Sequence, residues 1–189
     1  MLIKSIFAGF GGQGVLLAGY ALADAAMIEG RHVTFLPSYG AEMRGGTANC
    51  TVAISDEEIA SPVASAPEYV VAFNTPSLVR FQNHVQTGGQ LFLNSTLITE
   101  EPHRLDVGIF RVPASEIAEK LGNPRGTNAV MLGAFVKVTR LVALESLIAT
   151  LPEVLGAGRK DLIAINEQCL RAGYDSLEGA ENGHQADHR

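Results

Sequence analysis

A chain of 189 residues with 47% hydrophobic residues, 20 glycines and no tryptophan has the composition of a compact globular protein with many tight turns. Such a chain buries roughly two-thirds of its unfolded surface, enough for one core without disulfides or metals. The balance of 14 basic against 20 acidic residues gives a net charge of −6. The broad positive surface that a phosphate backbone requires is lacking, so we expect no nucleic acid as a partner.

The two cysteines, Cys50 and Cys169, lie far apart, and neither has a second thiol or a histidine at ligand spacing. We expect both to be core residues in a reducing cytoplasm, with no metal ion or iron–sulfur cluster bound by this chain. The uncharged stretch 5–23 has some features of a signal peptide, but glycines and Gln13 interrupt its centre. Apolar spans this short do not cross a bilayer, so we expect neither export nor a membrane segment.

The chain begins with a predicted strand over 2–7, a glycine loop over 9–14 and a helix over 15–28 that is rich in Ala and Leu and stops at Gly30. A second short strand over 32–36 completes a βαβ pattern. We expect its two strands to be parallel and joined by a right-handed crossover. This unit predicts an α/β fold, namely a single Rossmann-like domain with a mainly parallel sheet flanked by helices.

The remaining strands share β-branched or aromatic content and flanking turn residues, and are predicted over 49–55, 69–73, 90–94 and 108–112. In the first of them apolar and small residues alternate, which predicts one less buried face. The remaining helices are predicted from Thr75 onward and over 114–121, 127–142, 144–155 and 160–172. Thr75 followed by Pro76 is a helix start, because threonine caps free amides and proline suits the first turn.

The helix over 127–142 is apolar on nearly every side, which predicts burial of most of its circumference. We expect it to pack on a partner chain in a homodimer or larger assembly. The last helix carries an apolar stripe and is predicted to end at Gly173. We assign residues 1–174 to the domain and 175–189 to a polar tail, which is expected to be disordered.

The glycine loop follows the pattern G-x-G-x-x-G between a predicted strand and a predicted helix. Its candidate binding residues are Gly9, Gly11, Gly12, Gln13 and Gly14. Glycines permit positive φ and let a phosphate approach the backbone, while the helix start points amides at an anion. A nicotinamide dinucleotide also needs a carboxylate at the end of the second strand, where this chain has Leu36-Pro37-Ser38. The loop is therefore either a tight turn with a close packing contact, or a site for another phosphate or a partner.

A second candidate loop, 37–47, places an aromatic ring, a carboxylate and a guanidinium among glycines directly after the second strand. Its candidate binding residues are Ser38, Tyr39, Glu42 and Arg44. Both loops should emerge beyond the carboxyl ends of parallel strands, where doubly wound proteins bind ligands. The alternative is an internal pair of Glu42 with Arg44 that braces the loop, and an exposed pair of this kind stabilises little.

At these two loops the sequence resembles the gamma subunit family of 2-oxoacid:ferredoxin oxidoreductases, the group that acts on pyruvate, 2-oxoglutarate or branched-chain 2-oxoacids. The similarity covers residues 2 to about 174. Its motifs are Gly9-Phe10-Gly11-Gly12-Gln13-Gly14-Val15, Pro37-Ser38-Tyr39-Gly40 with Glu42 and Arg44-Gly45-Gly46, Ser61-Pro62, and Asn128 through Met131-Leu132-Gly133-Ala134.

The resemblance implies a complex whose alpha, beta and ferredoxin-like delta subunits hold thiamine diphosphate, Mg²⁺ and 4Fe–4S clusters, convert a 2-oxoacid to an acyl-CoA and reduce ferredoxin. This chain has neither a Cys-x-x-Cys series nor a thiamine diphosphate motif, so we assign it no catalytic residue. Coenzyme A is the phosphate-bearing substrate that the resemblance supplies for the glycine loop, and overall similarity favours 2-oxoglutarate as the 2-oxoacid. The alternatives are a stand-alone Rossmann-type nucleotide-binding oxidoreductase and a plain oligomeric scaffold.

Overall fold

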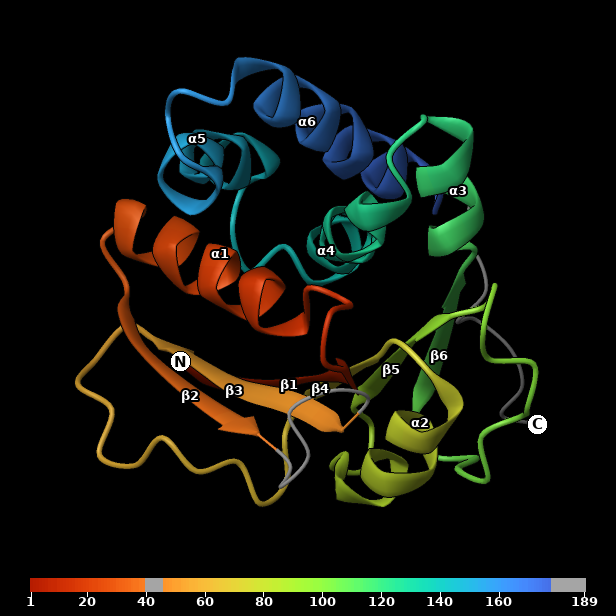
Figure 1. The fold of residues 1–189 in the computed structure, drawn as a ribbon. Coiled ribbons are helices and arrows are strands. Elements are labelled where there is room, and N and C mark those ends of the chain that lie inside the picture. The colour runs from red at the N-terminus through yellow and green to blue at the C-terminus, as the bar shows by residue number, and fades with distance from the viewer. Residues whose placement is uncertain (40–45, 178–189) are drawn as a thin grey trace.

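A computed structural model describes residues 1–39 and 46–177 of the chain. These residues form one α/β unit in which strands and helices largely alternate (Figure 1). The elements are β1 (Leu2–Phe10), α1 (Val15–Ile28), β2 (His32–Tyr39), β3 (Thr47–Ser55), β4 (Tyr69–Ala72), α2 (Thr75–Phe81), η1 (Gln82–His84), β5 (Gln90–Asn94), β6 (Gly108–Val112), α3 (Ala114–Lys120), η2 (Pro124–Gly126), α4 (Thr127–Thr139), α5 (Leu144–Leu155) and α6 (Lys160–Asp175).

The six strands form one sheet in the order β2-β3-β1-β4-β5-β6. Strands β1, β4, β5 and β6 are parallel neighbours, whereas β3 runs antiparallel to both β1 and β2. Because β1 and β2 are each antiparallel to β3, they point in the same direction, and β3 alone is reversed. The predicted fold class, an α/β domain with a mainly parallel sheet flanked by helices, is confirmed.

The expected βαβ unit is wrong in one respect, because β1 and β2 are not neighbours. β3 lies between them, with Phe7 opposite Cys50 on one side and Pro37 opposite Cys50 on the other. The reason lies in burial: β3 buries residues on both of its faces, whereas the last four residues of β2 are exposed. Proline lacks an amide hydrogen and is tolerated on an edge strand, which is the place that β2 occupies.

The helices lie unevenly on the two faces of the sheet. Figure 1 shows α1, α3, α4, α5 and α6 on one face and α2 on the other. The larger core lies under the first group, and Phe135 of α4 stands at its centre. Its ring meets those of Phe7, Tyr69 and Phe92 edge-on, at centroid distances of 5.4, 5.6 and 5.1 Å. A smaller core between the sheet and α2 includes Leu78 and Phe81, which lie on the inward face of that helix.

Helix α4 is buried by this chain's own elements, chiefly by α6. Every residue from 128 to 136 is buried, so the apolar surface that was expected to bind a partner chain is already covered. The helix also ends earlier than predicted, at Thr139, because Arg140 adopts a left-handed conformation with φ of 53°. The apolar residues of α4 therefore need no partner chain to cover them.

Two glycines allow α4 and α6 to touch. A Cβ atom on Gly133 would overlap the carbonyl of Leu170, and one on Gly173 would overlap the carbonyl of Val130. The prediction that Gly173 ends the last helix is wrong, since α6 continues to Asp175. Gly173 is instead a buried packing position, and close backbone approach, not chain reversal, is the reason for glycine there.

The structure describes the chain up to Leu177, just beyond the end of α6. Leu177 is buried, and residues 178–189 lie outside the described residues, so the disordered tail stays a prediction.

Within residues 1–39 and 46–177, no helix combines the length and the apolar character needed to cross a membrane.

Candidate functional site at the carboxyl edge of the sheet

The chain leaves two adjacent parallel strands toward opposite faces of the sheet. After β1 it enters α1 on one face, and after β4 it enters α2 on the other (Figure 1). Neighbouring strands whose connections diverge in this way form the topological switch point of an open α/β sheet. The crevice outside their carboxyl ends is where such proteins bind ligands. The glycine loop therefore stands at the position that the fold reserves for a site.

The glycine loop is a tight turn, and its positions require glycine for different physical reasons. Gly9 lies in β1, where a Cβ would come within 2.6 Å of Cγ2 of Val15. The amide of Gln13 donates to the carbonyl of Phe10 at 3.1 Å, which closes the turn. Gly12 and Gly14 have φ of 98° and 73°, in the region where side chains are strained. Of these two glycines, only Gly12 also has open space beside it, since a Cβ there meets no atom within 4 Å, whereas a Cβ on Gly14 would overlap Asn128.

Two asparagines hold this loop from opposite sides. Nδ2 of Asn74, which follows β4, donates to Oε1 of Gln13 at 2.8 Å. Nδ2 of Asn128, in the first turn of α4, donates to the carbonyl of Gly14 at 3.2 Å. The same carbonyl accepts the first hydrogen bond of α1, from the amide of Ala18. Asn128 was already part of the motif that carries the family resemblance, whereas Asn74 was missed.

The sequence contains a helix-capping signal before α2, but it was assigned to Thr75 and not to Asn74. Thr75 was predicted to cap α2, yet the cap is Asn74, whose Oδ1 accepts from the amide of Ser77 at 2.9 Å. Asparagine is a better helix cap than threonine, and proline is tolerated at the second helical position because the amides of the first turn have no intrahelical partner. Reading Asn74 as the cap would have placed a buried amide side chain at the carboxyl end of β4.

The amino ends of α1 and α4 meet at this loop without a compensating negative charge. Neither helix has an acidic residue in its first turn, and neither has a side-chain cap on its free amides among the described residues. Asn128, at the start of α4, contacts Gly14, at the start of α1. Helix amino ends carry partial positive charge and unpaired amides, so an anion would be stabilised at this corner.

The second candidate loop is shorter than predicted. Ser38 and Tyr39 belong to β2, with Tyr39 opposite Ala48, and the Tyr39 side chain is 73% exposed. Glu42 and Arg44 lie outside the described residues, so their positions and their predicted pairing stay predictions. The expected meeting of the two loops is seen at one described contact, where the amide of Gly11 donates to the carbonyl of Gly46 at 3.1 Å.

The strand order also bears on a nicotinamide dinucleotide site. Such a site uses a carboxylate at the end of the second strand to bind the ribose of a nucleotide held at the first strand. Here β2 ends in Ser38 and Tyr39, and β3 separates it from β1. Both the chemistry and the distance across the sheet are unsuited to that role, so the geometry disfavours a nicotinamide dinucleotide.

Both cysteines are buried core residues, as predicted. Cys50 lies on β3 beneath α1, and burial raises the pKa of its thiol to about 12. Burial also raises the pKa of the Cys169 thiol on α6. A thiol that stays protonated is a poor nucleophile and a poor metal ligand. Among the residues that the structure describes, no three His, Cys, Asp or Glu side chains are grouped so as to hold a metal ion.

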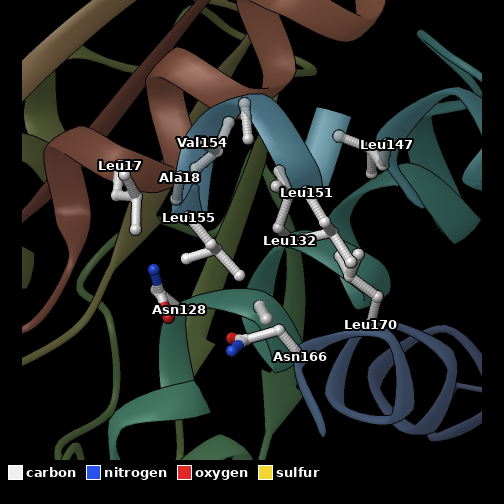
Figure 2. Close-up of a pocket in the computed structure, with 12 residues that line it drawn as sticks. Leu17, Ala18, Asn128, Leu132, Leu147, Leu151, Val154, Leu155, Asn166 and Leu170 are labelled. Carbon is white, nitrogen blue, oxygen red and sulfur yellow. The ribbon is translucent and has the colours of Figure 1, made fainter. Parts of the chain in front are cut away.

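A small apolar cavity lies between α1, α4, α5 and α6 (Figure 2). Apolar side chains such as Leu17, Leu132 and Leu155 line it, together with the amides of Asn128 and Asn166. Its volume is about 30 Å³, which corresponds to roughly one water molecule. The space is a packing gap between helices and is too small for a nucleotide or coenzyme A.

An open α/β sheet with a glycine loop at its switch point defines a domain of the doubly wound class. The family assignment follows from sequence. Residues 4–176 match the family described as pyruvate ferredoxin/flavodoxin oxidoreductase, and the chain belongs to this family. Over 94% of its length it is 40% identical to the ketoisovalerate oxidoreductase subunit VorA of Methanothermobacter marburgensis. Over 84% of its length it is 32% identical to the 2-oxoglutarate synthase subunit KorC of Methanocaldococcus jannaschii.

A solved structure shows the same fold. The keto/oxoacid ferredoxin oxidoreductase gamma subunit from Geobacter sulfurreducens PCA superposes with a TM-score of 0.79 at 25% identity, covering 93% of this chain and 98% of that one. The relatives differ in length, because the chain spans 88% of KorC but only 38% of VorA. The same unit therefore occurs nearly alone in one relative and joined to further polypeptide in another.

Proposed function

We propose that this chain is the small, non-catalytic gamma subunit of a thiamine diphosphate-dependent 2-oxoacid:ferredoxin oxidoreductase. The match over residues 4–176 carries the proposal, because it includes nearly every described element. The chain also spans 88% of KorC, a relative that is named as a subunit of 2-oxoglutarate synthase. The stand-alone nucleotide-binding oxidoreductase is disfavoured by the end of β2, where neither Ser38 nor Tyr39 is a carboxylate.

The partners in this proposal are alpha, beta and ferredoxin-like delta subunits, in a cytoplasmic complex that contains at least two copies of this chain. Thiamine diphosphate, Mg²⁺ and the 4Fe–4S clusters belong to those partners in this proposal, since the sequence offers neither a thiamine diphosphate motif nor a cysteine series. VorA supports close association, because there the equivalent of this chain is joined to a longer polypeptide. A unit that works beside its partner can be fused to it or kept separate without loss.

We infer that the substrate is 2-oxoglutarate, which the complex converts to an acyl-CoA. The relative KorC, named for 2-oxoglutarate, matches at nearly full length. A branched-chain 2-oxoacid is the second candidate, favoured by the higher identity with the ketoisovalerate subunit VorA. Turnover of 2-oxoglutarate, ketoisovalerate and pyruvate by the same preparation, compared as kcat/KM, would decide between them.

The glycine loop is the proposed site at which this subunit contacts a substrate or a partner subunit of the complex. We propose that it meets a phosphate of coenzyme A, or an acidic group of a partner subunit, at the amino end of α1. The uncapped first turns of α1 and α4 and the open side of Gly12 support an anion there. Tyr39 and Ser38, with Glu42 and Arg44 beyond them, are proposed to extend this contact surface.

Reconstitution tests the proposed function. The purified chain should bind neither NAD, NADP nor flavin, and should show no turnover of 2-oxoacids. Co-expressed with alpha, beta and delta subunits, it should co-purify with them and be needed for coenzyme A-dependent ferredoxin reduction. Full activity of a complex that lacks this chain, or tight binding of a nicotinamide or flavin nucleotide by the chain alone, would refute the proposal.

A further inference from the structure

We propose that Asn74 is a positioning residue that fixes the glycine loop through the side chain of Gln13. Its effect on the loop follows from hydrogen bonds in this chain alone, whereas its effect on coenzyme A rests on the proposed function. Gln13 was predicted as a binding residue, but its side-chain oxygen is occupied inside the protein. Asn74 stood outside every predicted site.

The hydrogen-bond ladder between β1 and β4 is completed by a side chain. The amide of Phe73 donates to the carbonyl of Ala8 at 2.9 Å, which continues the parallel pairing one residue beyond β4. On β1 the amide of Phe10 then donates to Oε1 of Gln13 at 2.7 Å. Gln13 thus supplies the acceptor for the last amide of β1, at the point where the chain turns toward α1.

The same oxygen joins the two sides of the crevice. Oε1 of Gln13 also accepts from Nδ2 of Asn74 at 2.8 Å. Asn74 is only 4% exposed, and its Oδ1 accepts from the amide of Ser77 as the cap of α2. The Asn74 side chain therefore uses both ends, one for α2 and one for the glycine loop. A buried amide with both ends bonded has one orientation, and it transmits that orientation to Gln13.

There is little room for Gln13 to move while this contact persists. A Cβ on Gly9 would lie 2.7 Å from Oε1 of Gln13 and 3.0 Å from Cβ of Phe73, so the side chain is packed over the glycine of β1. Loss of the Asn74 donor removes one of its two anchors and frees the amide group to rotate. Rotation leaves the Phe10 amide without its acceptor and loosens Gly11 and Gly12, which follow directly.

The substitution Asn74→Asp separates the two roles of the side chain. An aspartate oxygen still caps Ser77, and aspartate is a preferred helix cap. Its second oxygen would face Oε1 of Gln13, so two acceptors would meet where a donor is needed. Asn83→Asp, on the exposed turn after α2, adds the same charge without touching the loop and is the matched control.

Amide hydrogen exchange on the full chain measures the loop directly. For Asn74→Asp we expect exchange at Phe10 to become about tenfold faster, as for loss of one net hydrogen bond, while α2 stays protected. Gln13→Met removes the acceptor without changing the α2 cap and should give the same result, which also covers the case that Asn74→Asp does not fold. Gln13→Glu keeps an acceptor and should retain slow exchange.

Kinetics of the reconstituted complex provide the second readout. With Asn74→Asp, the KM for coenzyme A should rise about tenfold at nearly constant kcat, whereas Asn83→Asp should leave both unchanged. Unchanged exchange at Phe10 in both Asn74→Asp and Gln13→Met would overturn the positioning role. Faster exchange with unchanged kinetics and assembly would leave that role intact and would instead refute the ligand contact in the proposed function.

Discussion

In the helical layer, Gly133 and Gly173 stand where α4 and α6 touch, and a side chain on either would overlap the backbone of the other helix. At the carboxyl edge of the sheet, Gly12 has a positive φ and open space beyond it. A side chain on Gly133 or Gly173 has no space, whereas a side chain on Gly12 would meet no other atom of this chain within 4 Å. Glycines in one chain thus separate into positions where close packing excludes a side chain and positions where only the backbone conformation requires glycine.

The largest effect is expected in the helical layer. Gly173→Ala should lower the free energy of unfolding by about 4 kcal/mol, because neither helix backbone can move without separating α4 from α6. Chemical denaturation of the purified chain measures this loss. Gly158→Ala, in the turn between α5 and α6 where a Cβ meets no atom within 4 Å, is the control and should change stability by less than about 0.5 kcal/mol. Equal stability of the two variants would mean that α4 and α6 do not pack as described.

The second prediction concerns the carboxyl edge of the sheet and the activity of the complex. Arg44→Ala should lower the activity of the reconstituted complex about tenfold or more, because a loop guanidinium binds carboxylate or phosphate groups. The melting temperature of the isolated chain should stay the same, in contrast to Gly173→Ala. Wild-type activity would show that Arg44 only braces its own loop, and a large fall in melting temperature would make Arg44 structural.

Gly12→Val sharpens the comparison within the edge itself. A branched side chain there should raise the KM for coenzyme A about tenfold, or prevent assembly, while the chain still folds. Positive φ strains any such variant, so strain needs its own control. Gly122→Val is suitable, since Gly122 also has a positive φ, 76°, and no neighbour within 4 Å. If both variants behave alike in the complex, the glycine loop is only a turn.

The smallest effect is expected for the titration of Cys50. Burial holds its pKa at about 12 in the folded chain, against an unfolded value of about 8.5. A raised folded pKa contributes stability that is complete below the unfolded value and is lost as pH rises toward the folded one. The stability difference between the wild type and Cys50→Ala should therefore shrink between about pH 9 and 12. A constant difference over that range would show that the thiol is not shielded from water.

The sequence by itself predicted most of the elements and the class of the fold. Strands β5 and β6 and helices α1 and α5 have the predicted bounds, because periodicity and turn residues are local signals. The glycine loop was placed correctly between a strand and a helix for the same reason. The family motifs also identified Asn128, which holds the loop at Gly14.

Only the tertiary structure decided which elements are neighbours. The insertion of β3 between β1 and β2 depends on which strand buries both faces, and strand patterns do not specify pairing partners. Likewise, the sequence does not show that α6 covers the apolar surface of α4. Nor does it show that Gly173 packs against the backbone of Val130 and does not end the helix. Asn74 and Gln13 are 61 residues apart in the chain. Their contact exists because parallel pairing of β1 with β4 brings the ends of those strands together, and no local signal records that pairing.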